Sequence, residues 1–336
     1  MEMRIIGFDG LEPTLLYPNL DRFPNFRAAV ERGLSGRLAT TQPPITPVAI
    51  ATFATGLSPQ EHGILSAFKT PTGGFVNYDM IRGRTFWDAL NRAGISVSVI
   101  AVPLTYRPFI EKGYMISGFL TPPGALTYYY PGWVRAYARP FGDFSHDLKH
   151  HTREEHEALL KRELDPAYWW AAARAQAEAM LRLQQEHPTD VQVWYFSFTD
   201  FISHHCWHDR DVMLQTYAVV DEILGRIQGD VNLVFSDHGF GDILGPECEH
   251  YRQAEDAVFL SQYLSDGHSD HGIFLAYGRG IAHGTLEDAT IGQIGATVCH
   301  WLGVTFPGEP VDIAELYTPA EQRAIEAQLT SLGYIA

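Results

Sequence analysis

Three aspartates follow short apolar segments of this 336-residue chain. Asp9 comes after "RIIGF", Asp200 after "VQVWYFSFT" and Asp237 after "VNLVFS". Such segments are typical of buried parallel strands, and open α/β sheets bind ligands beyond the carboxyl ends of their strands. Three carboxylates gathered at one edge would repel each other strongly unless cations held them together. Their positions therefore predict a cation site at the carboxyl edge of a sheet.

Histidines accompany these aspartates. His204 lies four residues after Asp200, so a helix there would put both side chains on one face. His238 directly follows Asp237, and His268 lies in the loop-like stretch "DGHSDHG". Mixed sets of aspartate and histidine suit zinc and related divalent ions. We therefore expect divalent metal ions, zinc first, although manganese, iron and cobalt accept the same ligands.

Thr46 stands before Pro47, where a helix is expected to begin. Threonine is a common helix cap and proline is favoured at the first helical position, so capping alone would explain this pair. A helix N-terminus also suits a phosphate, and a metal ion touching the hydroxyl would make it a nucleophile. With Thr46 included, the candidate groups are too many for one tetrahedral ion. They suit two ions about 3.5–4 Å apart, as in phosphoryl transfer.

Each candidate also has a structural explanation. Asp9 suits a tight turn, Asp200 and His204 suit a solvated helix face, and His271 is a rival ligand to His268. A functional site is favoured because the three aspartates, far apart in the chain, all lie at expected strand ends.

The surrounding elements alternate between strands and helices. Strands are expected at Arg4–Gly10, Ile95–Pro103, Val191–Asp200, Val231–Gly239 and Gly272–Gly278. Helices are expected at Pro24–Gly36, Ala49–Thr55, Thr85–Gly94, Ile291–Leu302 and from Pro319 onward. This alternation predicts an α/β fold with a mostly parallel central sheet flanked by helices on both faces.

The middle of the chain differs in composition, with aromatic clusters, a charged stretch and an Ala-rich helix. We expect residues 105–190 to form an inserted, largely helical cap that selects the substrate, over a core of residues 1–104 and 191–336. Candidate substrate contacts are Tyr106, His205 and His208. Local core explains Tyr128, Tyr129, Tyr130 and Trp133 better, and a solvated helix explains His146, His150, His151 and His156 better.

Charge and composition exclude several classes of protein. The net charge of -16, from 40 acidic and 24 basic residues, argues against a nucleic-acid polymer as partner. No apolar run approaches the roughly 18 residues of a membrane span, and the opening "MEMRIIGFDG" predicts a strand rather than a secretory signal. The three cysteines form no CxxC motif, and Cys248 with His250 matches no zinc-site spacing, so we expect a cytoplasmic protein. The oligomeric state is left open.

Several motifs, in this order along the chain, resemble the alkaline phosphatase superfamily, and the branch they look most like is the type I phosphodiesterase/nucleotide pyrophosphatase family. They are "GFDG", "PPITPVAIATFATGLSPQEHGI", "FTDFISHHCW", "SDHGF" and "HSDHGIFLAYG". The stretches "TFWDALNRAG", "VPLTYRP", "YMISGFLTP" and "LGYI" are similar to prokaryotic members of that branch.

The resemblance implies a site with two zinc ions. One ion would be held by Asp9, Thr46, Asp237 and His238, and the other by Asp200, His204 and His268. Thr46 would attack a phosphodiester or pyrophosphate of a small substrate and form a phosphothreonine that water hydrolyses. Alternatives with the same site are a phosphomonoesterase, a phosphate transferase or mutase, and a metal-binding scaffold without catalysis. One position departs from the family, because Ala49 stands where nucleotide pyrophosphatases usually carry asparagine.

Overall fold

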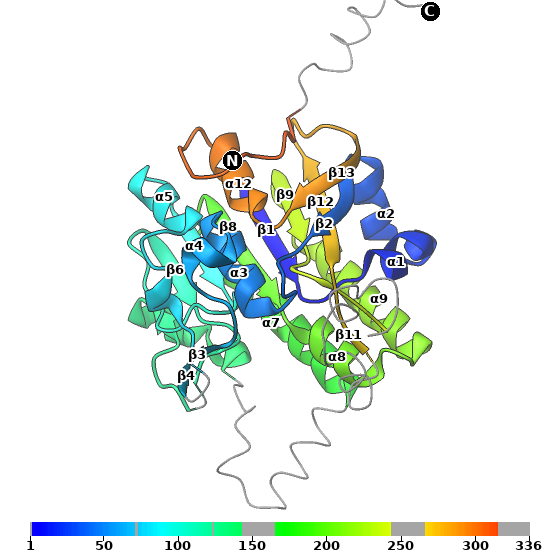
Figure 1. Cartoon of the computed structure of the whole chain (residues 1–336), viewed down its shortest axis with the longest axis horizontal. Helices are drawn as coiled ribbons and strands as arrows, with labels where there is room; N and C mark the ends of the chain where they lie inside the picture. The colour runs from blue at the N-terminus through cyan, green and yellow to red at the C-terminus, as the bar shows by residue number, and fades with distance from the viewer. Residues whose placement is uncertain (1, 71–72, 123, 143–164, 243–265, 315–336) are drawn as a thin grey trace, which may run out of the picture.

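The computed structural model describes residues 2–70, 73–122, 124–142, 165–242 and 266–314 (Figure 1). Its centre is a nine-stranded sheet with the strand order β13-β2-β12-β9-β1-β8-β5-β6-β7. The strands of this sheet are β1 (Met3–Phe8), β2 (Gly33–Ala39), β5 (Val97–Ile100), β6 (Gly113–Ile116), β7 (Tyr129–Tyr130), β8 (Val191–Phe196), β9 (Val231–Phe235), β12 (His271–Gly278) and β13 (Gly284–Thr290). Two small antiparallel pairs accompany it, β3 (Phe68–Thr70) with β4 (Gly73–Phe75) and β10 (Gly239–Asp242) with β11 (Asp266–Ser269).

Most neighbouring strands of the central sheet are parallel. Strand β1 lies between β8 and β9 and is parallel to both, β5 is parallel to β8 and β6, and β13 is parallel to β2. Strand β12 runs antiparallel to β9 and β2, and β7 runs antiparallel to β6. Every residue of β1, β8 and β9 is buried, as expected for strands covered on both faces. The prediction of a mostly parallel sheet is confirmed.

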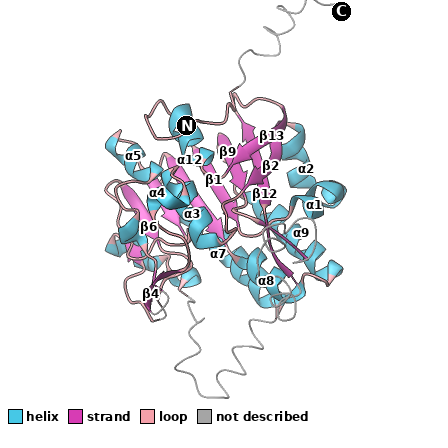
Figure 2. Ribbon diagram, in the orientation of Figure 1, coloured by secondary structure: helices cyan, strands magenta, loops and turns pink. Residues whose placement is uncertain are grey.

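Helices cover both faces of this sheet (Figure 2). One core cluster contains residues of α3 (Thr46–Thr55), α5 (Phe86–Arg92) and α12 (Gln293–Trp301). The other contains residues of α2 (Pro24–Glu31), α7 (Pro166–Glu186), α8 (Phe198–Cys206) and α9 (Arg210–Arg226). Within β1, Ile5 belongs to the first cluster and Ile6 to the second, because successive side chains of a strand point to opposite faces. The remaining α-helices described, α1 (Pro13–Leu16) and α4 (Pro59–His62), have four residues each.

Two expectations about the elements were wrong. The helix expected at Pro24–Gly36 ends at Glu31, and Gly33 to Ala39 form β2. The glycines, interpreted as a helix stop, instead allow close strand pairing: a Cβ on Gly36 would lie 2.0 Å from the Leu286 carbonyl oxygen of β13. The strand expected at Val191–Asp200 ends at Phe196, so Asp200 lies in the first turn of α8.

The division into a core and an inserted cap remains a prediction. The sheet continues past residue 104, since β6 and β7 extend its edge, while α7 contacts α8 and α9. Several residues discussed above lie outside the described part of the chain: His146, His150, His151, His156, Cys248, His250 and the helix expected from Pro319. Among the described residues, no helix combines the length and the apolarity needed to cross a bilayer.

Candidate active site

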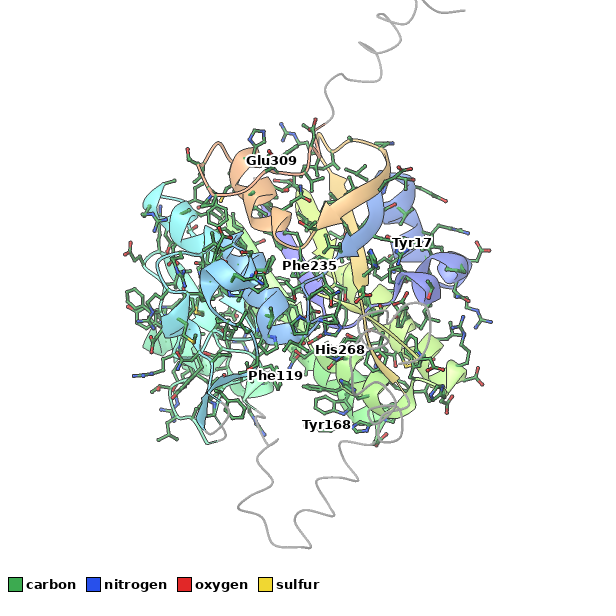
Figure 3. All side chains as sticks on the ribbon, viewed as in Figure 1. Tyr17, Phe119, Tyr168, Phe235, His268 and Glu309 are labelled. Atoms are coloured by element: carbon green, nitrogen blue, oxygen red, sulfur yellow. The ribbon has the colours of Figure 1, made fainter. Side chains whose placement is uncertain are left out.

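The three aspartates meet at the carboxyl edge of the sheet because the strands that precede them are neighbours. Asp9 follows β1, Asp200 lies in the first turn of α8 after β8, and Asp237 follows β9, while β8, β1 and β9 are adjacent in the sheet. All three are buried, with exposed fractions of 2%, 7% and 0% respectively. His268 comes to the same edge from β11 (Figure 3).

Asp9, Asp237 and His238 form the first compact group of possible ligands. One ligating atom of each lies within 4.8 Å of the others. The Nε2 atom of His238 is 3.2 Å from Oδ1 of Asp9 and 3.5 Å from Oδ2 of Asp237. Two carboxylates and one imidazole nitrogen around a common point are a donor set that a divalent transition-metal ion accepts.

Asp200, His238 and His268 form the second compact group. The Nε2 atom of His268 lies 3.3 Å from Oδ1 of Asp200, and the Nε2 atom of His204 lies 3.5 Å from the same oxygen. The two nitrogens are 3.1 Å apart, so His204 reaches the second group from α8. His238 therefore takes part in both groups, whereas the sequence assigned it to the first alone.

Thr46 joins the two groups through its hydroxyl. Its Oγ1 lies 3.2 Å from Nε2 of His238 and 3.4 Å from Oδ1 of Asp9. The expectation that Thr46 caps the helix was wrong, because Ile45 is the cap residue and Thr46 is the first residue of α3. The N–H groups of Val48 and Ala49 donate to the Ile45 carbonyl, so the hydroxyl of Thr46 is not used for capping and faces the carboxylates.

Backbone carbonyls fix the orientation of two imidazoles. Nδ1 of His268 lies 2.7 Å from the carbonyl oxygen of Pro44, and Nδ1 of His238 lies 2.9 Å from that of Gly239. A carbonyl only accepts hydrogen bonds, so Nδ1 carries the proton in both rings. Each Nε2 is then left with its lone pair directed at the carboxylates, which is the arrangement that metal-binding histidines usually have.

Burial and mutual repulsion perturb the titratable groups. Burial, followed by the charges of Asp237 and Asp200, raises the pKa of Asp9 well above its usual range. Burial alone would raise the pKa of Asp200, whereas positive charge on His204 and His268, present when these rings are protonated, holds that pKa well below its usual range. Burial lowers the pKa of His268, which favours the neutral ring. Strongly perturbed carboxyl groups in one crevice are typical of a functional site.

Three buried carboxylate oxygens lack a hydrogen-bond donor among the described residues, namely Oδ1 of Asp200 and both oxygens of Asp237. A buried carboxylate without donors is costly, and two that lie together are costlier. Two divalent ions would remove this cost, so the residues present fit a metal centre.

The other sequence candidates lie apart from these groups. His205 and His208 are exposed and contribute to neither ligand group, and Tyr106 is half-buried, with its carbonyl accepting the N–H of Tyr78. His271, the rival of His268, belongs to neither group. Ala49 is a fully buried residue of α3 that belongs to the first core cluster, so its side chain faces the core.

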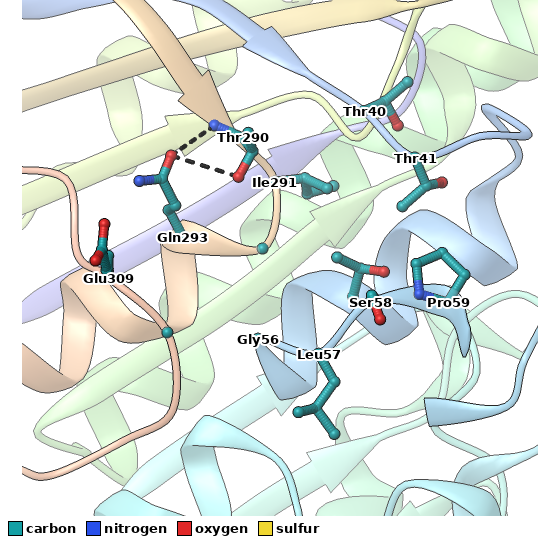
Figure 4. A pocket seen from close by; sticks show the side chains of 13 residues that line it. Thr40, Thr41, Gly56, Leu57, Ser58, Pro59, Thr290, Ile291, Gln293 and Glu309 are labelled. Carbon is teal, nitrogen blue, oxygen red and sulfur yellow. Dashed lines mark hydrogen bonds between the residues drawn. The ribbon is translucent and has the colours of Figure 1, made fainter. Parts of the chain in front are cut away.

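A separate cavity of about 310 Å³ lies beyond the ends of β2 and β13 (Figure 4). Its walls come from the loop before α3, the C-terminal half of α3, the start of α12 and the chain near residue 308. The lining residues are Thr40, Thr41, Thr52, Gly56, Leu57, Ser58, Pro59, Thr290, Ile291, Gly292, Gln293, Gly308 and Glu309. None of the candidate metal ligands lines this cavity.

The family model described as "Type I phosphodiesterase / nucleotide pyrophosphatase" matches residues 4–296. The chain belongs to this family. As a member of the type I phosphodiesterase family it is a hydrolase of phosphate-ester bonds, of a metal-dependent kind that acts on small phosphorylated substrates. Among curated proteins, none gives a significant sequence match.

Solved structures with the same fold include an ectonucleotide pyrophosphatase/phosphodiesterase and an alkaline phosphatase. Murine ectonucleotide pyrophosphatase/phosphodiesterase 5 is 15% identical, with a TM-score of 0.59, over 94% of this chain and 100% of that one. The human protein of the same name is 14% identical, with a TM-score of 0.57, over 93% and 97%. The wild-type alkaline phosphatase PafA is 13% identical, with a TM-score of 0.62, over 93% and 98%. At these identities the likeness shows the fold, which confirms the predicted alkaline-phosphatase-like architecture.

Sequence reasoning missed the residues that hold the candidate ligands in place. The Thr199 hydroxyl donates to the carbonyl of Asp9. The Ser236 hydroxyl donates to the carbonyl of His238 at 2.6 Å and accepts the N–H of Leu11 at 2.7 Å. Both hydroxyl residues directly precede a candidate ligand in sequence, and that adjacency was the only available signal.

Proposed function

We propose that this chain hydrolyses a phosphodiester or pyrophosphate bond with Thr46 as the nucleophile beside two divalent metal ions. The observation that carries the proposal is the position of the Thr46 hydroxyl, 3.2 Å from His238 and 3.4 Å from Asp9, where the two ligand groups meet. A threonine hydroxyl is a weak nucleophile unless a neighbouring group or metal activates it.

The residues divide into ligands for two ions. Asp9, Asp237 and His238, with the Thr46 hydroxyl, would hold one, while Asp200 and His268, with His204, would hold the other. Zinc is the proposed metal, and manganese, iron and cobalt accept the same donor set. When bound, such ions lower the pKa of a hydroxyl and stabilise charge on the entering and leaving oxygens.

The chain's own groups orient the reaction. The bond from Thr46 Oγ1 to phosphorus forms as the bond to the leaving oxygen breaks, and water then cleaves the phosphothreonine to restore the hydroxyl. Pro47 has no N–H, and no acceptor for the Thr46 N–H is found among the described residues. That N–H, at the positive end of α3, is suited to bind a phosphate oxygen.

One structure of murine ectonucleotide pyrophosphatase/phosphodiesterase 5 is described as an inactive threonine-to-alanine variant in complex with AMP. A threonine on which activity depends and a phosphate monoester ligand in that protein agree with the chemistry proposed for Thr46. We further propose that residues 105–190 select the leaving group.

Turnover of a diester and of a monoester at equal enzyme concentration tests the proposal. The substrates are bis(para-nitrophenyl) phosphate and para-nitrophenyl phosphate, each with and without added zinc or manganese. We expect metal-dependent turnover with the diester preferred. A strong preference for the monoester would instead support the phosphomonoesterase, an alternative that the likeness in fold to PafA favours.

A further inference from the structure

Glu12 is a buried carboxylate three residues after Asp9, with an exposed fraction of 1%. It precedes α1, and its Oε1 accepts the N–H of Thr14 at 2.9 Å. Helix capping of this kind uses one oxygen and is normally a surface feature. It explains neither the burial of the side chain nor the contacts of its second oxygen.

The second oxygen of Glu12 links strand β10, which follows His238, to strand β11, which contains His268. Oε2 accepts the Ser269 hydroxyl at 2.6 Å and the Phe240 N–H at 3.1 Å. Ser269 belongs to β11 and directly follows His268, while Phe240 belongs to β10 and lies two residues after His238. In the β10–β11 pair, Phe240 stands opposite His268, so one carboxylate oxygen bridges the backbone segments of both imidazoles.

The surroundings leave Glu12 little freedom. A Cβ on Gly239 would lie 2.3 Å from Oε2 of Glu12 and 2.3 Å from Oγ of Ser269, so the backbone of β10 packs directly against the carboxylate. The backbone N–H of Glu12 donates to the hydroxyl of Tyr217, a fully buried residue of α9, at 2.7 Å. Main chain and side chain are thus both fixed, as expected of a group that orients others.

Charge gives the same residue a second role. Asp9, Asp200 and Asp237 supply three negative charges when ionised, one fewer than the positive charge of two divalent ions. Glu12 is a fourth buried carboxylate, hydrogen-bonded to the segments that carry His238 and His268, and with it the carboxylate charges number four. A buried charge is tolerated when opposite charges and hydrogen bonds compensate for its desolvation.

We propose that Glu12 is a positioning residue of the metal centre, which fixes the spacing of His238 and His268 and adds a fourth buried carboxylate to the three aspartates. This inference rests on the two-metal site proposed above. Burial raises the pKa of Glu12, and its hydrogen bonds to Ser269, Thr14 and Phe240 act in the opposite direction. The geometry assigns it no contact with substrate.

The test compares zinc affinity, measured by competition with a chromogenic chelator, in wild type, Glu12→Gln and Ser269→Ala. Glu12→Gln keeps the shape of the side chain and removes its charge, whereas Ser269→Ala keeps the charge and removes one hydrogen bond. We expect the weaker zinc ion to bind at least about tenfold less tightly in Glu12→Gln, which corresponds to about 1.4 kcal/mol. A smaller loss, about threefold, is expected for Ser269→Ala. Raised zinc should restore kcat in both variants.

Asp221→Asn is the matched control. Asp221 is also buried, with an exposed fraction of 4%, and accepts the N–H of Phe26 at 2.7 Å, but it ties α9 to α2. This variant should lower the unfolding temperature of the metal-free protein and leave zinc affinity unchanged.

The outcomes separate the two proposals. Wild-type protein that binds fewer than two ions defeats the two-metal site itself. If wild type binds two ions and Glu12→Gln binds zinc with unchanged affinity, the proposed role of Glu12 is wrong. If Glu12→Gln does not fold, Ser269→Ala decides, because unchanged affinity in that variant also overturns the positioning role.

Discussion

The imidazole rings of His238 and His268 are stacked, with centroids 3.7 Å apart and planes inclined by 13°. His238 follows β9 and His268 lies in β11, and each donates its Nδ1–H to a backbone carbonyl. Two protonated rings at this separation would repel each other, and burial lowers the pKa of His268. Neutral imidazoles that direct Nε2 into one crevice are the form that binds metal ions.

The shared position of His238 predicts unequal losses of metal. His238 belongs to both compact groups and is fully buried, while the side chain of His204 is 40% exposed and reaches only the second group. We expect His238→Ala to lose both ions and His204→Ala to lose one at most, as counted by metal analysis of dialysed protein. Loss of both ions from His204→Ala would contradict this division.

Thr46 should be indispensable for turnover but not for folding. Thr46→Ala removes the hydroxyl that contacts Asp9 and His238, and we expect kcat to fall by about 10³-fold or more. Thr46→Ser keeps a hydroxyl at the same place and should retain measurable activity. Both variants should keep at least one metal ion, which separates loss of the nucleophile from loss of the site. Equal kcat in wild type and Thr46→Ala would exclude Thr46 as the nucleophile.

Metal removal should destabilise the protein. The contribution of Asp237 to stability should change sign when the metal is removed. At a free metal concentration about 100 times Kd, binding of one ion stabilises the fold by about 2.7 kcal/mol, so chelation should lower Tm by about 4 °C for each ion removed. Both oxygens of Asp237 lack a hydrogen-bond donor among the described residues. Asp237→Asn should therefore raise Tm of the metal-free protein and abolish the gain from metal, as calorimetry with and without chelator would show.

The sequence was sufficient to predict that the candidate side chains gather at one edge of the sheet, because its signals are local. A carboxylate after an apolar run marks a strand end, and parallel neighbours bring Asp9 and Asp237 together. It was not sufficient to divide the ligands, since the sharing of His238 depends on how β10 and β11 pair. Glu12 escaped notice for the same reason, because a glutamate before a proline resembles an exposed helix cap until the strands that contact it are known.

Close backbone approach was the other feature that local patterns could not predict. The glycines of β2 resemble a helix stop, and only pairing with β13 reveals why Gly36 has no side chain. Gly36→Ala would place a Cβ 2.0 Å from the Leu286 carbonyl oxygen, so we expect the free energy of unfolding to fall by about 1–3 kcal/mol in urea titrations. Gly132→Ala is the control, since no atom lies within 4 Å of that added Cβ, and its effect should stay within about 0.5 kcal/mol.

Buried His62 should make stability fall in mild acid. Burial, followed by the charge of Arg84, lowers the pKa of His62 to about 4. Its Nε2 lies 3.0 Å from the Thr52 hydroxyl and its Nδ1 accepts the Ile64 N–H at 3.1 Å, which holds the ring neutral. The unfolded chain binds this proton near the ordinary pKa of about 6.5, so stability is full above that pH and is lost as pH falls toward 4.

The size of this effect is set by the separation between the two pKa values. Between pH 7 and pH 5, metal-free wild type should lose about 1–2 kcal/mol more unfolding free energy than His62→Gln, which cannot titrate at this position. Urea titrations of both proteins at the two pH values measure the difference directly. Metal-free protein is needed because the candidate ligands also titrate in this range. Parallel loss in the two proteins would show that His62 is not the group responsible.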